Sequence, residues 1–545
     1  MLAGSITHSF WPADTTEPIL ETTVGSVLRD AARLATDCPA LVAGTPDPDD
    51  RRRWTYGELL ADAERVAQAL LGRFVPGERV AVWANSIPEW VVLEFGAALA
   101  GITLVTVNPA YRARELEYVL AQSRAHGIFL LREYRGSPMA GILEEVRPKL
   151  RELREVVMFS DWRAFCASGS PTERLPEVRP DDPAQIQYTS GTTGFPKGAV
   201  LHHRGVTNTA RLMGRCWGSD ASDVWVNPLP MFHIGGCVIG TLVPVQSLGT
   251  QVLVPFFDAG LELELVEAER CTVLFGVPTM LIAMLEHADF AGRDLSSVRF
   301  AVCGGATVPP EMVQHMEARL QRPFSIIFGQ TEASGVITMT RLDDRPEDRA
   351  TSLGQPLPQA EVKIIDPSTQ AVVPPGVIGE LCTRGYQVMH GYFDNQDATG
   401  AAVDPEGWLH TGDLCSMDAR GYCRIEGRLK DMIIRGGENI YPREIEQLLF
   451  SHPSVADAAV LGVPDPKWGE QVAAFIRPVA GKAPTAEELF SFCRQQLAPH
   501  KTPRYWEFVE QFPMTPSGKI QKFVLRDRFV AQDPHDERRR AIASR

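Results

Sequence analysis

The stretch YTSGTTGFPKGAVLHH, from Tyr188 to His203, is the part of the chain from which the fold is best predicted. It gathers hydroxyl side chains, glycines and one lysine into a few positions and then becomes apolar. A loop of this composition can hold phosphate oxygens through its N–H groups, hydroxyls and ammonium group. It is not a P-loop, because two residues separate Gly194 from Lys197, and Gly198 follows the lysine in place of a hydroxyl residue. The stretch predicts a phosphate-binding loop of another kind, with a flexible linker between two strands as the alternative.

Short apolar runs and segments of helical periodicity alternate on both sides of this loop. Thr55 is the expected N-cap of the first of the long helices. The expected strands are 79–84, 101–108, 251–254, 272–276 and 299–303, and the expected helices are 54–71, 87–99, 114–123, 261–269 and 278–287. Such alternation predicts parallel sheets whose strands are joined by crossover helices.

The pattern changes in the last third of the chain. Short strands divided by Pro and Gly turns, at 361–365, 379–383 and 422–425, predict a small β-barrel-like part. From residue 441 a helix, strands at 458–463 and 471–477, a helix at 485–497 and a strand at 507–510 predict a compact α+β domain. The expected fold is therefore α/β. A large N-terminal domain, 1–429, would hold two parallel-type α/β subdomains (1–180 and 181–350) and the β-barrel-like part (351–429). A small, mobile α+β C-terminal lid domain would occupy 430–545.

Composition limits the classes of partner. The chain has 545 residues, of which 44% are hydrophobic and 22% are charged, as in globular proteins with more than one core. Its net charge of −14 argues against a nucleic acid or an anionic membrane as the main partner. The 10 cysteines are scattered without zinc-ligand spacing, so reduced thiols in a cytoplasmic protein are expected.

Two segments bear on targeting and membranes. The N-terminus lacks a basic region followed by an apolar run, so no signal peptide is expected. Residues 224–257 contain no Asp, Glu, Lys or Arg and are long enough to span a bilayer. Pro228, Pro230, Pro244 and Pro255 interrupt this segment, so a buried turn, helix and strand are expected in place of an integral membrane segment.

Five further segments follow the first loop in a fixed order. They are CGGATVPPE (Cys303–Glu311), FGQTE (Phe328–Glu332), GWLHTGD (Gly407–Asp413), GRLKDMIIRGGENIYPREIE (Gly427–Glu446) and PSGKIQK (Pro516–Lys522). With the loop, they make residues 25–530 resemble the superfamily of adenylate-forming acyl-CoA synthetases, luciferases and peptide-synthetase adenylation domains. The resemblance implies ATP and CoA as co-substrates, Mg²⁺ as cofactor and a carboxylic acid as substrate.

The resemblance assigns roles around the nucleotide. It implies that the loop holds the β- and γ-phosphates, that Thr331 contacts the α-phosphate and that Glu332 is the Mg²⁺ ligand. Phe328 would stack on adenine, and Asp413 would bind the ribose with help from Arg428. The implied ATP-binding residues are Thr189, Ser190, Gly191, Thr192, Thr193, Gly194, Lys197, Gly304, Gly305, Ala306, Phe328, Gly329, Gln330, Thr331, Asp413, Arg428 and Lys519. Alternatives remain for Asp413 as a turn residue and for Arg428 as an interdomain ion pair.

The resemblance also implies a catalytic lysine and a hinge. Lys519 would bridge carboxylate and phosphate during adenylate formation, with a solvated surface lysine as the alternative. Lys430 would be the hinge about which the small domain rotates between the two half-reactions. After rotation, the residues that line the CoA channel would be Arg435, Gly436, Gly437 and Glu438.

The acyl group is expected near PLPMFHIGG. His233 falls where relatives place an aromatic residue or His beside the acyl carboxylate, and a packing histidine is the alternative. The implied pocket contains His233, Ile234, Gly235 and Gly236, and the absence of charge in 234–240 favours an alkyl chain. The 188–257 region is most similar to medium- and long-chain fatty acyl-CoA synthetases.

The expected function is therefore activation of a medium- to long-chain fatty acid to acyl-AMP, followed by transfer to CoA. The alternatives are an aryl-acid CoA ligase, an acyl-AMP ligase that loads a separate carrier protein, a luciferase-type oxygenase and a non-catalytic nucleotide-binding protein. A homodimer is an assembly that the sequence leaves open.

Overall fold

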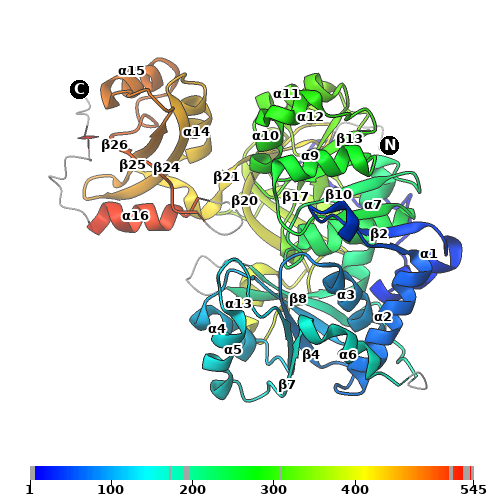
Figure 1. Ribbon diagram of the computed structural model, residues 1–545. Coiled ribbons are helices and arrows are strands. Elements are labelled where there is room, and N and C mark those ends of the chain that lie inside the picture. Colours follow the sequence, from blue (N-terminus) through cyan, green and yellow to red (C-terminus); the bar gives the residue numbers. More distant parts are fainter. Residues whose placement is uncertain are drawn as a thin grey trace. The chain divides into compact units, whose positions relative to one another are not determined.

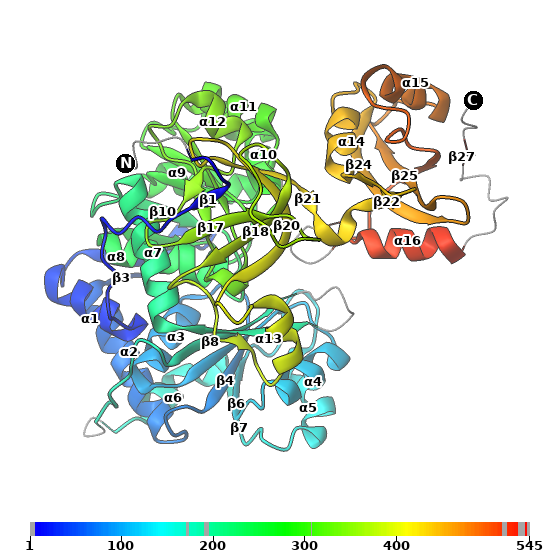
Figure 2. The same cartoon turned by 180° about the vertical axis from the view of Figure 1, so that it is seen from behind.

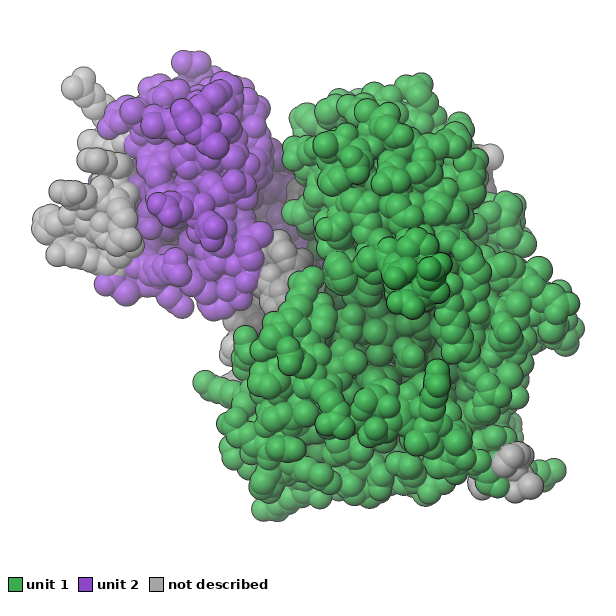
Figure 3. Space-filling view, viewed as in Figure 1, with its two compact units in different colours: residues 1–363, 382–411, 418–423 green, residues 364–381, 412–417, 424–545 purple. Residues whose placement is uncertain are grey.

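The computed structural model describes residues 6–170, 174–189, 196–306, 308–514, 520–531 and 540–541. The chain divides into two compact units, coloured in Figure 3. Unit 1 comprises Met1–Lys363, Cys382–Thr411 and Asp418–Cys423, and unit 2 comprises Ile364–Leu381, Gly412–Met417 and Arg424–Arg545. Because this division passes through the segment expected to be barrel-like, the domain boundary at residue 430 stays a prediction.

Unit 1 contains a nine-stranded sheet in the order β16-β15-β14-β13-β12-β10-β11-β2-β3. Figure 1 labels its strands β2, β10 and β13. The strands β14, β13, β12, β10, β11 and β2 run parallel, and their buried apolar residues are typical of strands covered on both faces. The bounds are β2 Pro39–Ala43, β3 Arg53–Thr55, β10 Val224–Asn227, β11 Thr250–Leu253, β12 Val273–Gly276, β13 Phe300–Cys303, β14 Phe324–Phe328, β15 Thr338–Met339 and β16 Gln355–Pro356. The predicted parallel α/β architecture is confirmed.

A seven-stranded sheet of unit 1 has the order β19-β9-β8-β5-β4-β6-β7. Its strands are β4 Arg79–Trp83, β5 Thr103–Val107, β6 Gly127–Leu130, β7 Glu155–Met158, β8 Pro183–Thr189, β9 Lys197–His202 and β19 Gly391–Tyr392. Neighbours from β8 to β7 are parallel, whereas β9 is antiparallel to both β8 and β19. The phosphate-loop motif therefore connects the two antiparallel strands β8 and β9.

Helices of unit 1 join and cover these sheets (Figure 1). They are α1 Val24–Leu34, α2 Tyr56–Leu71, α3 Pro88–Ala100, α4 Ala113–Gln122, α5 Met139–Val146, α6 Trp162–Ala167, α7 His203–Trp217, α8 Gly240–Ser247, α9 Ala259–Ala268, α10 Pro278–Glu286, α11 Pro310–Leu320, α12 Pro346–Thr351 and α13 Gln396–Ala402. Thr55 caps α2 as predicted, in a reciprocal capping box with Glu58. One buried cluster contains Trp90 of α3, Val206 of α7 and Trp225 of β10, so helices and sheets share a core.

The charge-free segment 224–257 is folded into unit 1 as predicted. It forms β10, a π-helical turn at Gly235–Ile239, α8 and β11. Within the described ranges, no helix is both long and apolar enough to cross a membrane.

A five-stranded sheet has the order β1-β17-β18-β20-β21. Its strands are β1 Phe10–Trp11, β17 Glu361–Ile365, β18 Gly379–Arg384, β20 Leu409–Met417 and β21 Cys423–Arg428. The three strands predicted here from the sequence are present as β17, β18 and β21.

The C-terminal part of unit 2 is a sheet with helices on both faces (Figure 2). Its strands are β22 Ile433–Arg435, β23 Glu438–Ile440, β24 Val455–Asp465, β25 Gly469–Pro478, β26 Tyr505–Phe508 and β27 Arg540–Ala541, and its helices are α14 Pro442–Phe450, α15 Ala486–Gln496 and α16 Lys522–Ala531. One core cluster contains Ile445 of α14 and Leu489 of α15. A second contains Leu525 of α16, so the predicted compact α+β architecture is confirmed.

Candidate active site

The parallel strands of the nine-stranded sheet bring three motif segments to one edge. β10 leads to His233, β13 leads to Gly304 and β14 leads to Phe328–Glu332. Cys303 pairs with Ile326, so the carboxyl ends of β13 and β14 are neighbours. Ligands of open α/β sheets bind at this edge, and these segments are therefore placed where a nucleotide site is expected.

Close packing explains why Gly304 has no side chain. A β-carbon at this position would lie 2.5 Å from Cγ1 and 2.7 Å from the carbonyl oxygen of Ile327. Gly305 has a φ of +77°, a conformation that glycine adopts without strain. The backbone from Gly304 to Ala306 is thereby held in a turn whose last two residues are exposed.

The two sheets of unit 1 meet around the carboxylate of Glu332. Thr189, at the end of β8, donates a hydrogen bond from Oγ1 to Glu332 Oε1 at 3.3 Å. The Tyr392 hydroxyl donates to the same oxygen at 2.8 Å, and burial together with the Glu332 charge raises the pKa of Tyr392. Lys197 Nζ lies 4.9 Å from the centre of the Tyr392 ring. A carboxylate and a hydroxyl beside an ammonium group are a donor set that fits a hard cation with phosphate.

A hydrogen bond joins two motifs that lie far apart in the sequence. Gln330 Nε2 donates to the carbonyl oxygen of Thr411 at 2.9 Å, linking FGQTE to GWLHTGD within unit 1. Thr331 is buried beside Glu332 in the 3₁₀ turn Thr331–Ala333.

Asp413 and Arg428 form an ion pair within unit 2. Arg428 Nε lies 3.2 Å from Asp413 Oδ1, and the Asp413 side chain is buried whereas that of Arg428 is half-exposed. The two residues occupy β20 and the end of β21. Their predicted contact with a ribose stays a prediction.

His233 is oriented by its own turn. Its Nδ1 accepts a hydrogen bond from the N–H of Gly235 at 3.1 Å, so the neutral ring carries its proton on Nε2. Ile234, Gly235 and Gly236 are buried, and a β-carbon on Gly236 would lie 2.3 Å from the carbonyl oxygen of Pro230. The glycine at position 236 is thus required by the backbone packing of the turn itself.

A buried polar network lies against this turn, and the sequence patterns did not indicate it. Gln185 Nε2 donates to Glu94 Oε1 at 2.6 Å, and Gln187 Nε2 donates to Gln185 Oε1 at 2.7 Å. Gln187 Nε2 also lies 3.2 Å from Sγ of Cys237, which belongs to the π-helical turn. Burial raises the pKa of Glu94 and that of the Cys237 thiol well above their ordinary values.

The hinge and channel residues lie in unit 2. Lys430 is in the 3₁₀ turn Leu429–Asp431, and burial lowers the pKa of its ammonium group. Gly436 and Gly437, with φ of +61° and +89°, form the turn between β22 and β23. A β-carbon on Gly436 would lie 2.7 Å from the ring of Trp468.

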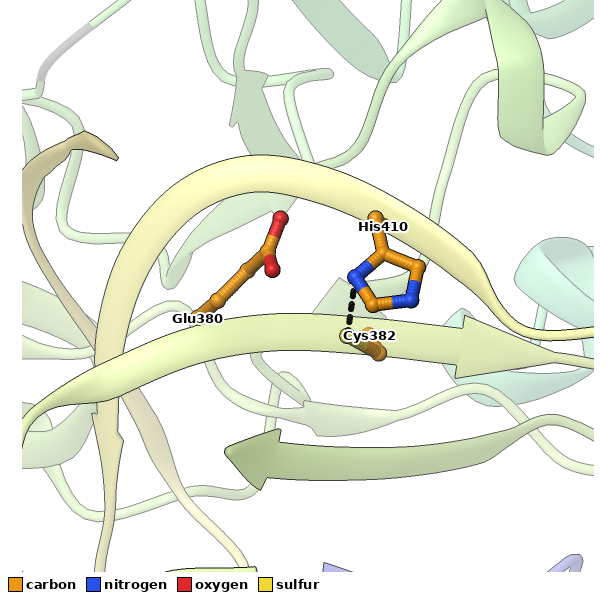
Figure 4. A group of neighbouring side chains, drawn as sticks. All are labelled: Glu380, Cys382 and His410. Atoms are coloured by element: carbon orange, nitrogen blue, oxygen red, sulfur yellow. Dashed lines mark hydrogen bonds between the residues drawn. The ribbon is translucent and has the colours of Figure 1, made fainter. Parts of the chain in front are cut away.

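Side chains on and beside β18 hold the GWLHTGD segment (Figure 4). His410 Nδ1 lies 3.5 Å from Sγ of the fully buried Cys382, and His410 Nε2 lies 3.7 Å from Asp404 Oδ2. Glu380, on the same strand as Cys382, accepts a hydrogen bond from the N–H of Gly412 at 3.0 Å. Cys382 has no exposed surface, so its contact with His410 lies inside the fold. This contact and the hydrogen bond from Gly412 to Glu380 position the backbone of β20.

Six predicted site residues lie outside the described part of the chain. They are Ser190, Gly191, Thr192, Thr193, Gly194 and Lys519. Met514 and Ile520, on either side of the Lys519 segment, pair in an antiparallel bridge.

Tyr392 is the contact of Glu332 that the sequence analysis missed. It belongs to the short segment HGYFDN, which lies between the FGQTE and GWLHTGD motifs. A glycine followed by an aromatic residue between two site motifs is the signal that could have indicated it.

Comparisons with known proteins agree with this geometry. A model of the AMP-binding enzyme family matches residues 28–393, and a model of the AMP-binding enzyme C-terminal domain matches residues 444–519. YngI of Bacillus subtilis (strain 168), whose name assigns it provisionally to the acyl-CoA synthetases, is 41% identical over 541 residues, which cover 94% of this chain and 98% of YngI. The mitochondrial medium-chain acyl-CoA ligase ACSF2 of Rattus norvegicus is 36% identical, with 95% of this chain and 89% of that protein covered.

The solved structures give the same result. The crystal structure of ATP-bound MatB from Rhodopseudomonas palustris matches with a TM-score of 0.85 at 28% identity, and covers 94% of this chain and 99% of that one. The chain belongs to the AMP-binding enzyme family of adenylate-forming proteins. Within that class it is an acyl-CoA synthetase, an AMP-forming acid–thiol ligase that uses ATP and CoA.

Proposed function

We propose that this ligase activates a medium- to long-chain fatty acid as its adenylate, with Mg²⁺ as cofactor, and then transfers the acyl group to CoA. The observation that carries the proposal is the convergence of Thr189, Lys197 and Glu332 at the strand ends of two sheets, in the same unit as a charge-free turn. The three residues suit a triphosphate, and the charge-free turn suits an alkyl chain.

In the first half-reaction, a carboxylate oxygen of the acid attacks the α-phosphorus of ATP, and the bond to the bridging oxygen of pyrophosphate breaks. Lys197 binds the leaving phosphates and Thr331 orients the α-phosphate. Glu332 and Thr189 would hold Mg²⁺, which supplies positive charge to the triphosphate. Lys519 would add its ammonium group between the carboxylate and the phosphate as negative charge develops there.

In the second half-reaction, the CoA thiol gives up its proton to solvent and its sulfur attacks the acyl carbonyl carbon. The bond between that carbon and the phosphate oxygen breaks, and AMP leaves with its electron pair. The turn Arg435–Glu438 is proposed to line the approach of the thiol after rotation about Lys430. Gly436 supports this role because a side chain there would meet Trp468 and reshape the hairpin. The two half-reactions then use different faces of the C-terminal domain.

The preference for an alkyl chain is supported by the acyl side of the site. The turn from Ile234 to Gly240 is buried and carries no charged residue, so a charged substrate tail would meet no counter-ion in it. His233, with its Nδ1 engaged by Gly235, can present Nε2–H to the acyl carboxylate. ACSF2, a protein 36% identical to this chain, is named as a medium-chain acyl-CoA ligase.

A panel of carboxylic acids tests the proposal. Straight-chain acids from acetate to palmitate, together with benzoate and anthranilate, would be incubated with ATP, Mg²⁺ and CoA, and acyl-CoA would be measured by mass spectrometry. We expect octanoate to palmitate to give the highest kcat/KM, with acyl-AMP and pyrophosphate accumulating when CoA is omitted. A preference for the aromatic acids would replace the fatty-acid assignment with an aryl-acid CoA ligase. Acyl-AMP formation without transfer to free CoA would point to a separate carrier protein.

A further inference from the structure

We propose that Tyr392 is a positioning residue of the nucleotide site, which orients the Glu332 carboxylate for Mg²⁺ and braces the phosphate-binding Lys197. This inference rests on the proposed function, because it assigns Glu332 and Lys197 to the MgATP complex. No role for Tyr392 follows from the six sequence motifs, since the residue lies in none of them.

The hydroxyl of Tyr392 and that of Thr189 act on the same oxygen of Glu332. Tyr392 donates to Oε1 at 2.8 Å and Thr189 donates to Oε1 at 3.3 Å. No hydrogen bond to Oε2 is found among the described residues. Two donors on one oxygen fix the plane of the carboxylate and leave the second oxygen for a cation.

The ring of Tyr392 lies beside the ammonium group of Lys197. The distance of 4.9 Å from Nζ to the ring centre is within the range of a cation–π contact. β19 pairs with β9, so that Tyr392 is opposite Ala199, two residues beyond Lys197. One side chain therefore contacts both the predicted metal ligand and the predicted phosphate-binding cation.

The backbone holds Tyr392 in this place. Its N–H donates to Oγ1 of Thr399 at 2.9 Å, in α13. A β-carbon on the preceding Gly391, whose φ is +140°, would lie 2.7 Å from Cγ2 of Thr399. The strand is thus anchored by α13 before any ligand binds, which is the preorganisation that metal-ligand carboxylates need.

The test compares the binding of ATP with and without Mg²⁺. Calorimetric titration of ATP in the absence of any carboxylic acid gives one Kd in EDTA and another in excess Mg²⁺. Tyr392→Phe removes only the hydroxyl. We therefore expect the Kd ratio, which is the Kd in EDTA divided by the Kd in Mg²⁺, to fall by about tenfold relative to wild type. Thermal unfolding should be unchanged. A ratio that stays within about threefold of wild type overturns the proposal.

A matched control removes the same hydroxyl elsewhere in unit 1. Tyr422 donates a hydrogen bond to Asp344, so Tyr422→Phe also breaks a tyrosine–carboxylate contact, and its Kd ratio should equal that of wild type. Glu332→Gln, made alone and with Tyr392→Phe, gives a double-mutant cycle. The tyrosine substitution should have no further effect on the ratio once the carboxylate is gone, and additive effects would contradict the inference.

The outcomes separate this inference from the proposed function. A wild-type protein that forms acyl-AMP and binds MgATP, combined with an unchanged ratio in Tyr392→Phe, removes only the role of Tyr392. A wild-type protein that forms no acyl-AMP from any acid removes the proposed function together with it. If Tyr392→Phe unfolds, Mn²⁺ binding in the presence of ATP is measured for the wild-type and Glu332→Gln proteins. Equal Mn²⁺ affinity of the two proteins overturns the assignment of the Glu332 carboxylate as the metal ligand, and with it the role of Tyr392.

Discussion

The side-chain amide of Gln330 donates a hydrogen bond to the carbonyl oxygen of Thr411, across 81 positions of the sequence. Gln330 follows β14 and Thr411 lies in β20, two residues before Asp413. Two of the motifs predicted to contact the nucleotide are therefore joined directly by this bond. The bond joins FGQTE to Thr411 in the first part of β20, the strand that also carries Asp413, the residue predicted to bind the ribose.

Replacing Gln330 by alanine should weaken ATP binding. The variant loses one hydrogen bond of about 1 kcal/mol, so we expect the KM for ATP to rise about fivefold with a smaller change in kcat. Steady-state kinetics at saturating acid and CoA measure the effect. Gln359→Ala is the control, because its amide donates to the carbonyl of Glu17 elsewhere in unit 1. Equal effects of the two variants on KM would contradict the prediction.

Glu94 should tolerate glutamine but not leucine. Burial raises its pKa, which favours the neutral carboxyl group, and glutamine preserves the acceptor for Gln185 Nε2. Leucine leaves the buried amide of Gln185 without this acceptor, at a cost of about 1–3 kcal/mol in the free energy of unfolding. Denaturant titration should rank wild type and Glu94→Gln together, above Glu94→Leu. A Glu94→Leu protein as stable as wild type would show that the network contributes nothing.

Glu262 should make stability depend on pH. It is fully buried on α9, neither carboxyl oxygen has a hydrogen-bond partner among the described residues, and burial raises its pKa well above the ordinary 4.5. Below pH 4.5 the residue is protonated in both states and imposes no ionisation penalty. As the pH rises from there toward the folded pKa, only the unfolded state ionises, and the free energy of unfolding falls by up to about 1.4 kcal/mol per pH unit.

Glu262→Gln removes this titration. Its free energy of unfolding should therefore rise relative to wild type as the pH increases above 4.5 toward the folded pKa, by at most the slope given above. Urea titrations at several pH values measure the difference. Glu144→Gln makes the same substitution at an exposed position of α5 and is the control variant. A flat difference for Glu262→Gln would contradict the buried, protonated state.

Gly436→Ala should impair thioester formation more than adenylate formation. The β-carbon meets the Trp468 ring at 2.7 Å and the φ of +61° is strained for alanine, so the turn between β22 and β23 must shift. Acyl-AMP formation and CoA transfer from preformed acyl-AMP are assayed separately, and we expect about a tenfold loss in the second only. Gly481→Ala, with a φ of +79° and no atom within 4 Å of its β-carbon, controls for backbone strain alone. Equal losses in the two half-reactions would remove the assigned channel role.

Lys519→Ala should impair adenylate formation more than CoA transfer, which is the reverse of the pattern expected for Gly436→Ala. Its ammonium group is assigned to charge that develops as the anhydride forms, so adenylate formation should fall by about 100-fold or more. Transfer from preformed acyl-AMP to CoA should be nearly unchanged, because the proposed mechanism assigns that step to the turn Arg435–Glu438 instead. Rapid-quench measurements of each half-reaction check the prediction. A comparable loss in CoA transfer would contradict the role of Lys519.

Much of the fold was predictable because its signals are local. The parallel strands are short apolar runs separated by amphipathic helices, and Thr55 caps α2 through Glu58 only three residues away. The structure also explains why a residue without a side chain is needed at two motif positions. The sequence had predicted only a ligand-binding role for these glycines. Gly304 packs on Ile327 and Gly236 packs on the carbonyl of Pro230, so both residues have a folding role besides any role in binding.

The sequence by itself determined the parallel α/β architecture, because periodicity involves residues that are near in the chain. It also determined the order of the motifs, and their resemblance to a known superfamily implied the enzyme class. Only the tertiary structure decided that Tyr392 contacts Glu332, that Gln185 receives Glu94 as its acceptor and that Trp468 packs on Gly436. These partners are separated by tens of positions, and they meet through the order of the strands and the packing of helices and turns against them. That order depends on the packing of the whole core, which no local pattern records.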